Sequence, residues 1–294
     1  MKITIEGLSK KYKNGKLALT DINLDIENGM FGLLGPNGAG KSSLMRILVT
    51  IMKPTTGLVN VNGFDLAKDR GEIRKMLGYL PQDFRFFSKL RTWEFLDYAA
   101  SLSGIKNKKI RLQKVDEWLE KVGLFDVRER HANKLSGGMK RRLGIAQALI
   151  SDPQIIVVDE PTTGLDPEER IRFRNILSEL GQKDVIIILS THIVGDISSV
   201  CRDLALLDNG MLQFNGPPEA LVEKTRGHVW QVKTSGVEYD LLKEKYAVIS
   251  TIPSEDGWEV QLVGKEIEAK NAIEIEPNLE HAYVYFMEYL SAGK

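Results

Sequence analysis

One glycine-rich segment, residues 35–42, constrains the fold of this chain more than any other part of its sequence. It reads Gly-Pro-Asn-Gly-Ala-Gly-Lys-Ser and fits the pattern G-x-x-x-x-G-K-[ST] in full. The apolar stretch Phe31–Leu34 before it predicts a buried strand, and the amphipathic stretch Lys41–Met52 after it predicts a helix. Glycines let backbone N–H groups curl around phosphate oxygens, and the start of a helix adds positive potential. The segment therefore predicts a phosphate-binding loop in an α/β fold.

The last residues of this loop have distinct expected tasks. Lys41 is expected to reach the β- and γ-phosphates of a nucleotide, and the Ser42 hydroxyl is expected to ligate Mg²⁺. The alternative is a glycine turn that happens to precede a lysine, but the strand and helix signals on either side favour the phosphate loop. The expected nucleotide-binding residues of the segment are Gly35, Pro36, Asn37, Gly38, Ala39, Gly40, Lys41, Ser42 and Ser43.

A second candidate centre lies where the apolar stretch Ile155–Val158 runs into two acidic residues. Adjacent residues of a strand point in opposite directions, so the two carboxylates can serve different tasks. We expect Asp159 to hold Mg²⁺ through its water shell and Glu160 to polarise the attacking water. The alternative is a strand that ends in two solvated acids, and the phosphate loop upstream favours the catalytic interpretation.

Composition excludes several classes of protein. The chain has 294 residues, of which 43% are hydrophobic and 27% charged, and this is typical of a globular protein with about two domains. Its longest strongly apolar runs, Ile155–Val158 and Val185–Leu189, are far shorter than the roughly 20 residues that a membrane helix needs. The polar N-terminus predicts no signal peptide. The single cysteine, Cys201, excludes an intrachain disulfide and fits a reducing cytoplasm.

The net charge of zero hides an asymmetry that supports two domains. Residues 1–218 carry 32 Lys and Arg against 26 Asp and Glu, whereas residues 219–294 carry 8 against 14. A mildly basic body suits a polyanionic ligand such as a nucleotide. It lacks the strongly basic face that is usual for nucleic-acid binding. Pro217-Pro218 predicts a hinge between the two domains.

The spacing of apolar residues predicts an α/β body and a small α+β tail. Residues 92–149 are expected to be mostly helical. The last helix of the tail is expected to begin near Asn278 and to carry Leu279, Tyr283, Phe286 and Leu290 on one face. That face either completes the tail's own core, or it holds two subunits together or tunes their turnover. The predicted strands are Lys2–Glu6, Leu19–Glu27, Gly57–Gly63, Lys75–Leu80, Ile155–Val158, Val185–Ser190, His228–Lys233, Tyr246–Ile252 and Trp258–Val263, with a hairpin over Leu204–Gly216 and helices over Pro167–Leu180 and Glu219–Lys224.

Further short motifs follow in the order of one known family. They are Gln82, Leu135-Ser136-Gly137-Gly138-Met139, Gly164-Leu165-Asp166-Pro167 and His192. With the phosphate loop and the two acids, residues 1 to about 218 resemble the ATP-binding subunit of an ATP-binding cassette (ABC) transporter. The resemblance implies a P-loop NTPase cassette with a RecA-like core, an antiparallel β subdomain and a helical subdomain over residues 87–151 or so. The small C-terminal α+β domain would then comprise residues 219–294.

The segment Leu135–Met139 resembles the signature of that family and opens a predicted helix. Its exposed N–H groups, the Ser136 hydroxyl and the helix dipole form a second anion-binding element. The resemblance implies that Ser136, Gly137 and Gly138 close over the nucleotide held by the phosphate loop of another molecule. The alternative is a serine N-cap with flexible glycines. Met139 stands where the family most often has Gln and resembles the branch that exports drugs and antibiotics.

The resemblance also implies roles for four other residues. Tyr12 would stack on adenine, and Gln82 would contact Mg²⁺ while its loop moves with the transporter. Asp166 belongs to the D-loop, and His192 would hold the γ-phosphate and the attacking water in line with Glu160. Each has a structural alternative, namely an exposed tyrosine, a surface-loop glutamine, a helix cap, and a capping or core histidine.

These features favour an ATPase subunit that energises transport and hydrolyses ATP to ADP and phosphate, with ATP and Mg²⁺ as cofactors. Because no membrane span is predicted, the permease is expected as a separate chain that holds this subunit at the cytoplasmic face of the membrane. A second copy, or a related subunit, would complete a head-to-tail dimer, and nucleic acid is not an expected partner. The aromatic residues Phe84, Phe86 and Phe87 are either core residues or part of a groove for a permease helix.

Two other classes of function are open to such a cassette. Soluble ABC proteins of translation usually carry two cassettes, and those of DNA repair insert long coiled coils, whereas Ser42 and Ser136 here are only 94 positions apart. A regulatory module without turnover would not need both Glu160 and His192. Among transporters, Met139 and a tail without a barrel pattern favour export of drug, antibiotic or sodium type over import, and the cargo is not encoded here.

Overall fold

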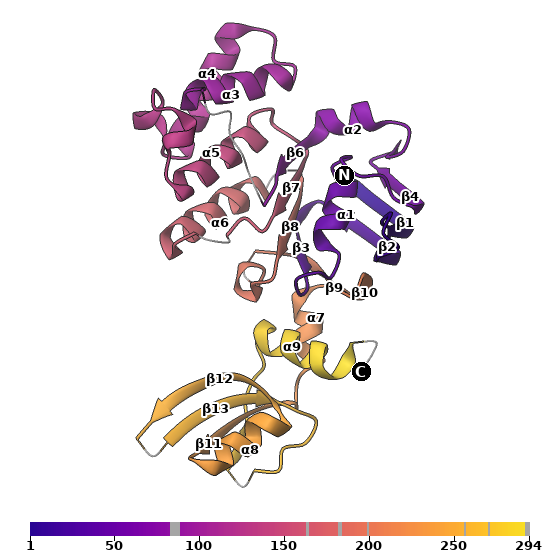
Figure 1. The fold of residues 1–294 in the computed structure, drawn as a ribbon, viewed down its shortest axis with the longest axis vertical. Coiled ribbons are helices and arrows are strands. Elements are labelled where there is room, and N and C mark those ends of the chain that lie inside the picture. Colours follow the sequence, from indigo (N-terminus) through magenta and orange to yellow (C-terminus); the bar gives the residue numbers. More distant parts are fainter. Residues whose placement is uncertain are drawn as a thin grey trace.

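The computed structural model describes residues 1–82, 89–162, 165–181, 184–198, 200–255, 257–269 and 271–291. Figure 1 shows an elongated molecule, in which a large N-terminal body of sheets and helices is followed by a smaller sheet domain at the C-terminus. Pro218 is the first residue of a helix that joins the two parts.

A six-stranded sheet forms the centre of the body, in the order β10-β9-β3-β8-β7-β6. All neighbouring pairs are parallel except β9 and β10, which form the predicted hairpin. Every residue of β7 and β8 is buried, as expected for parallel strands that are covered on both faces. The strands are β3 (Gly29–Leu34), β6 (Leu77–Leu80), β7 (Ile155–Asp159), β8 (Ile186–Thr191), β9 (Asp203–Asp208) and β10 (Met211–Gly216).

A second, antiparallel sheet covers one face of the central sheet. It has the order β2-β1-β4-β5, and its long strands confirm the two that the sequence predicted at the N-terminus. The apolar core between the sheets also takes in helix α1. The elements of this layer are β1 (Lys2–Lys11), β2 (Leu17–Glu27), α1 (Lys41–Leu48), β4 (Thr56–Val61), β5 (Phe64–Asp65) and α2 (Arg70–Met76).

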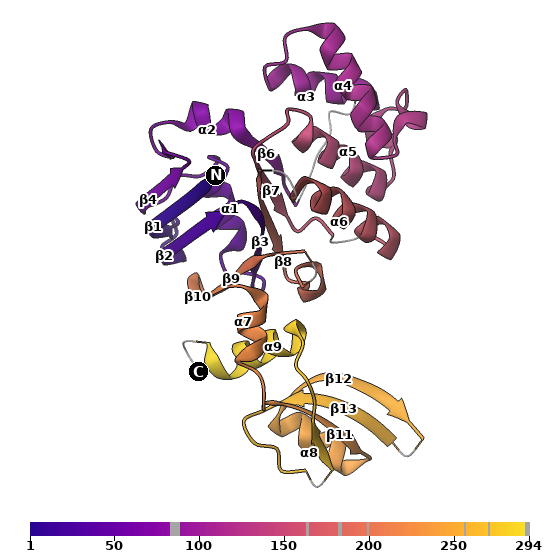
Figure 2. The same cartoon turned by 180° about the vertical axis from the view of Figure 1, so that it is seen from behind.

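The other face of the central sheet is covered by helices, as Figures 1 and 2 show. These helices bury a second apolar core, which includes Leu119, Leu143, Phe173 and Leu189. The predicted helical section over 92–149 is confirmed. The helices are α3 (Thr92–Leu102), α4 (Lys108–Lys121), α5 (Gly137–Leu149) and α6 (Pro167–Gly181), with short 3-10 turns at Phe125–Val127 and Ala132–Lys134.

Several predicted boundaries in the body are wrong, among them the end of β1, which lies at Lys11 rather than Glu6. Helix α1 ends at Leu48 rather than Met52, because Thr50 has a φ of 64° and is held there by a hydrogen bond of 2.6 Å from Arg74 Nε to its hydroxyl. The strand predicted over Lys75–Leu80 begins only at Leu77, because the preceding residues close α2.

The C-terminal domain is an antiparallel sheet in the order β12-β13-β11-β14, so the predicted α+β tail is confirmed. One apolar core of this domain lies between the sheet and α8 and includes Val232, Leu242 and Val260. The elements are α7 (Pro218–Glu223), β11 (Val229–Thr234), α8 (Val237–Lys245), β12 (Ala247–Ser254), β13 (Gly257–Val263), β14 (Ala272–Glu274), α9 (Leu279–Tyr285) and a π-helical turn, Phe286–Leu290.

Helix α9 lies between the body and the tail sheet, next to α7 (Figures 1 and 2). Leu279, Ala282 and Phe286 are buried in the same apolar cluster as the helical core of the body. Tyr285 instead packs in a cluster with residues of the tail sheet. The predicted apolar face therefore does not simply complete the core of the tail, because it docks the tail onto the body; Leu290, its last member, is 43% exposed.

Candidate active site

The predicted phosphate loop, carboxylates, Gln82 and His192 all follow strands of the central sheet. β3, β6, β7 and β8 are parallel, so the loops that leave their carboxyl ends meet at one edge of the sheet. A cavity of about 560 Å³ lies at this edge and contains most of the predicted residues. Its lining consists of Tyr12, Lys16, Ala18, Asn37, Gly38, Ala39, Gly40, Lys41, Ser42, Ser43, Gln82, Glu160 and His192.

The glycines of the loop are needed for its shape. Gly40 has a φ of 107°, and a Cβ atom there would lie 2.5 Å from the carbonyl oxygen of Ala18. Gly38 has a φ of 87° and faces open space. Among the described residues no side chain caps α1, so the N–H groups of its first turn are available to an anion.

Lys41 lies inside the curl of the loop. Its side chain is buried, and its ammonium donates hydrogen bonds to the carbonyls of Gly35 at 2.6 Å and Pro36 at 3.1 Å. Burial lowers the pKa of Lys41, and the charges of Glu160 and Asp159 oppose that shift. The ammonium is thus fixed between the loop and the acids, where phosphate groups on the loop would meet it.

Glu160 is the centre of a polar cluster in the cavity. One of its carboxylate oxygens accepts a hydrogen bond of 3.1 Å from Gln82 Nε2, and the other lies 3.4 Å from His192 Nδ1. The backbone of Glu160 has a φ of 44°, which is uncommon for a residue other than glycine. Its N–H lies 3.2 Å from the Ser190 carbonyl and 3.1 Å from the Ser190 hydroxyl. The structure therefore brings three of the predicted residues together.

Asp159 points to a different partner than its neighbour, as the alternation along a strand predicts. It is buried, and its Oδ1 accepts a hydrogen bond of 2.6 Å from the Ser190 hydroxyl. Ser190 thus contacts both acids, and the sequence analysis did not single it out. Its only signal was its place at the end of the apolar strand before His192.

The predicted metal-binding residues Ser42, Gln82 and Asp159 suit a Mg²⁺ site that is completed by phosphates and water. Within the described ranges, no group of three or more His, Cys, Asp or Glu side chains could form a metal cage. Mg²⁺ in phosphate sites is usually held by one or two protein oxygens together with phosphates and water. The hydroxyl, amide and carboxylate here fit that type, because Ser190 occupies only one oxygen of Asp159.

Tyr12 lies at the edge of the cavity with its ring half-buried. Its hydroxyl is 3.0 Å from Ser43 Oγ, and the Lys10 ammonium lies 5.7 Å from the centre of its ring. This placement is compatible with a base above the ring.

The signature residues and Asp166 do not line the cavity. Ser136 is exposed and caps α5, since its Oγ accepts a hydrogen bond of 3.2 Å from the Met139 N–H. Asp166 is exposed and caps α6 in the same way, through the Glu169 N–H at 2.9 Å. Both therefore adopt the capping geometry that was their structural alternative. Gly164, with Phe84, Phe86 and Phe87, lies outside the described residues.

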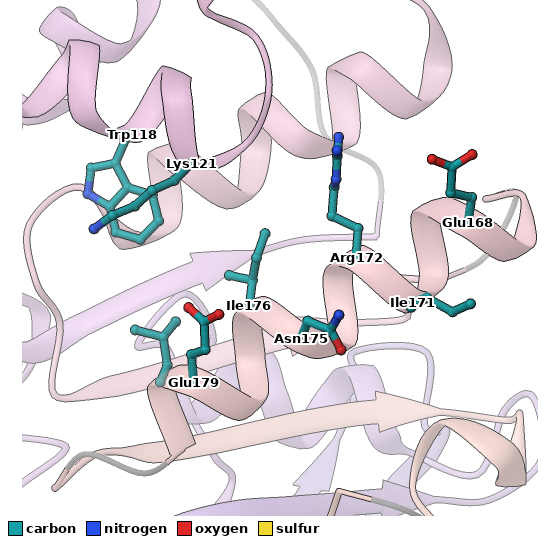
Figure 3. A pocket seen from close by; sticks show the side chains of 9 residues that line it. Trp118, Lys121, Glu168, Ile171, Arg172, Asn175, Ile176 and Glu179 are labelled. Atoms are coloured by element: carbon teal, nitrogen blue, oxygen red, sulfur yellow. The ribbon is translucent and has the colours of Figure 1, made fainter.

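Two further cavities lie among the helices. One of them lies between α4 and α6 and measures 540 Å³. In Figure 3, Trp118 and Lys121 of α4 lie across from Ile176 and Glu179 of α6. This cavity contains none of the predicted site residues. The other measures 680 Å³ and lies between α2, α3 and α5, with Tyr98 and Leu102 in its wall.

Comparison with known proteins decides the family. The family model described as "ABC transporter" matches residues 19–163. YxlF of Bacillus subtilis, named as an ABC transporter ATP-binding protein, is 33% identical over 262 residues, which are 88% of this chain and 86% of that protein. The chain belongs to the ATP-binding proteins of ABC transporters. The fold class predicted from the sequence is thereby confirmed.

Other relatives of this ABC protein extend the comparison. YbhF of Escherichia coli, named as a probable multidrug ABC transporter ATP-binding protein, is 37% identical over 227 residues, which are 76% of this chain and 39% of that protein. Among solved structures, the ATP-binding cassette MJ0796 in a dimeric post-hydrolysis state with ADP and Pi has a TM-score of 0.68. It is 26% identical, and the match covers 73% of this chain and 98% of that one. The chain is an ABC-type ATPase that binds ATP.

Sequence analysis missed Arg141, which lies in α5 behind this site. It stands in the run Lys140-Arg141-Arg142, and such a run is usually a solvated helix face. In the structure its guanidinium instead binds the backbone of the loops that carry Gln82 and Glu160.

Proposed function

We propose that this chain is the ATP-hydrolysing subunit of an exporter whose membrane-spanning part is a separate chain. The observation that carries the proposal is the cluster in which the Glu160 carboxylate lies between Gln82 and His192, in a cavity shared with Lys41. No helix of the described residues has the length and hydropathy to cross a membrane. The permease would hold the subunit at the cytoplasmic face of the membrane.

In this proposal the residues of the cavity divide the work of phosphoryl transfer to water. The loop N–H groups and Lys41 bind the phosphates, and Tyr12 supports the base. Glu160 accepts the proton of the attacking water, while His192 and Gln82 orient the carboxylate and the water. Mg²⁺, held by Ser42 and Asp159 with Gln82 beside them, would supply neutralisation of the phosphate charge.

A second subunit is part of the proposal because the predicted signature residues and Asp166 lie outside the cavity. Ser136, Gly137 and Asp166 are exposed. Two of the similar solved structures are described as dimeric forms of MJ0796. We infer that the signature of one subunit, with Gly138, closes over the nucleotide on the phosphate loop of the other, with Asp166 beside the junction.

The cavity between α2, α3 and α5 is the candidate docking place for the permease. Leu102 is 72% exposed and Tyr98 is 45% exposed in its wall. An amphipathic helix buries such side chains when it lies in a groove. Export is favoured over import because a relative is named as a probable multidrug protein and because the tail is an open sheet rather than a barrel.

Replacing Glu160 by Gln tests the central role. The amide keeps the size of the side chain but cannot accept the proton of the attacking water. ATP binding should persist while kcat falls by about 10²–10⁴-fold. An ATP-bound dimer should accumulate and be visible by size exclusion. Hydrolysis by Glu160→Gln at the wild-type rate would remove Glu160 from the mechanism.

A further inference from the structure

Arg141, in the second turn of α5, binds five backbone carbonyl groups with one guanidinium. A guanidinium has five N–H donors, so every donor of this side chain has an acceptor. The donors come from a helix and the acceptors from two loops of the central sheet. Nε donates to Pro161 at 3.0 Å, Nη1 to Pro81 at 3.0 Å and Gln82 at 3.1 Å, and Nη2 to Asp159 at 3.0 Å and Glu160 at 2.9 Å.

Four of the acceptors lie just beyond the ends of β6 and β7, and the fifth, Asp159, is the last residue of β7. Beyond its last ladder pair, each strand has carbonyl groups that need new donors. Arg141 supplies these donors for both strands at once. It therefore ties the loop of Gln82 to the loop of Glu160, and these two side chains are themselves joined by a hydrogen bond of 3.1 Å.

The backbone of Glu160 is held from both sides. Its φ of 44° lies in the left-handed region, which persists for such a residue only where its surroundings hold it. Ser190 binds its N–H, and Arg141 binds its C=O. Loss of the guanidinium would remove the contacts that hold the C=O of Glu160, and relaxation of its backbone would turn the carboxylate away from Gln82 and His192.

We propose that Arg141 is a positioning residue for ATP hydrolysis, which sets the direction of the Glu160 carboxylate and the Gln82 amide from the signature helix. The inference rests on the proposed role of Glu160. Because α5 begins with the signature residues, one rigid helix carries both the signature and the guanidinium that holds Glu160. A movement of α5 would therefore shift the backbone of Glu160, the proposed general base.

The charge of Arg141 suits this position. Burial lowers the pKa of its guanidinium to about 10, while the nearby Asp159 and Glu160 oppose the shift, so the side chain is a cation at neutral pH. A lysine at this place would keep the charge but would offer three donors on a flexible stem instead of five in a fixed plane. The Arg141→Lys substitution therefore separates the effect of the positive charge from the effect of the five fixed donors.

The test is steady-state ATP hydrolysis and ATP binding by the full chain. Arg141→Met should lower kcat by about 10–100-fold, the usual cost of a misplaced catalytic group, while the Kd for ATP stays within about threefold. The kcat of Arg141→Lys should lie between that of Arg141→Met and that of the wild type. Equal losses in kcat and in ATP affinity, or no loss in kcat, would overturn the inference.

Arg111 supplies the matched control. It is also a largely buried arginine, which donates to Asp97 at 2.7 Å and to the carbonyls of Ile105 and Lys106 at 3.1 Å, all within the helical section. Arg111→Met should lower the melting temperature but leave kcat unchanged wherever the protein is folded. An equal loss of kcat in both arginine variants would mean that Arg141 is only structural.

The Glu160→Gln background separates this inference from the proposed function. If Arg141 acts through Glu160, then adding Arg141→Met to Glu160→Gln should lower kcat no further. The inference would be refuted if Glu160→Gln lowers kcat and Arg141→Met then lowers it further by the same factor as in the wild type. That result would leave the proposed function standing. A wild-type rate for Glu160→Gln would refute the proposed function first. If Arg141→Met does not fold, Arg141→Lys decides by the same comparison.

Discussion

At the scale of residues, the site depends on a few side chains whose surroundings leave them little freedom. Lys41 is held by two carbonyls of the loop, and Glu160 is held by its backbone on both sides. The types of these residues could be predicted from the sequence, because glycine spacing and a strand ending in acids are local signals. Arg141 and Ser190 could not, because their roles depend on loops that are distant in the chain.

Replacing Lys41 by Ala should weaken MgATP binding by about 10²-fold or more, because hydrogen bonds from a cation to phosphate oxygens are lost. Isothermal titration measures the affinity directly. Lys68→Ala is the control, since that lysine is 80% exposed and pairs with Asp65 at 3.3 Å on the surface. Unchanged ATP affinity in Lys41→Ala would contradict the assignment of the loop, provided that both variants melt at similar temperatures.

At the scale of elements, the helices and strands in which apolar residues recur at a regular spacing were predicted from the sequence. Helices without such a spacing were missed. The two helices that the sequence analysis overlooked, α2 and α8, each bury a single residue, Ile73 and Leu242. One buried position cannot show a period of 3.6. Helices with longer buried stripes and strands with alternating burial were found. The position of α9 between the two domains could not be predicted from the sequence, because the same apolar residues could pack against either domain.

The first turn of α9 contains a histidine that should make stability depend on pH. His281 is buried, and its Nδ1 accepts a hydrogen bond of 3.3 Å from the Asn278 N–H, so Nε2 carries the proton towards Gln261 Oε1 at 3.2 Å. Burial lowers the pKa of His281, and the charge of Glu280 partly opposes this. The unfolded chain therefore takes up a proton near pH 6.5, and the folded chain only at lower pH.

It follows that this contribution to stability is fully present above about pH 6.5 and is lost as the pH falls towards the lowered pKa. The melting temperature of the wild type should decrease on acidification more steeply than that of His281→Gln. Gln can still accept the capping hydrogen bond but does not titrate. Parallel melting curves of the two proteins between about pH 7.5 and pH 5.5 would show that His281 has no such effect.

At the scale of the whole molecule, the tail is part of the structural core of the body. All predicted residues of the ATP site precede residues 219–294, yet the tail packs against the body. In the structure, removal of the tail would uncover Phe214, a buried residue of the body whose ring packs against Phe286 of the tail. The boundary near residue 218 divides the motifs from the tail but does not divide the apolar core.

Replacing Phe286 by Ala should loosen this junction. The ring is 6% exposed and lies 6.2 Å from that of Phe214 at an angle of 69°. Loss of a buried phenyl group costs about 3–5 kcal/mol, so the melting temperature should fall by several degrees while ATP affinity is unchanged. Leu290→Ala, in the same turn but 43% exposed, should change it little. Similar melting temperatures for both variants would show that α9 does not join the domains.

The buried thiol of Cys201 can report when the apolar cluster that joins the tail to the body opens. It is 8% exposed within the same apolar cluster as Phe286, and burial raises its pKa to about 12. A disulfide reagent reacts with the thiolate, so modification must wait until the cluster opens. Because the sequence contains no other cysteine, the rate of thiol modification reports how often that cluster opens.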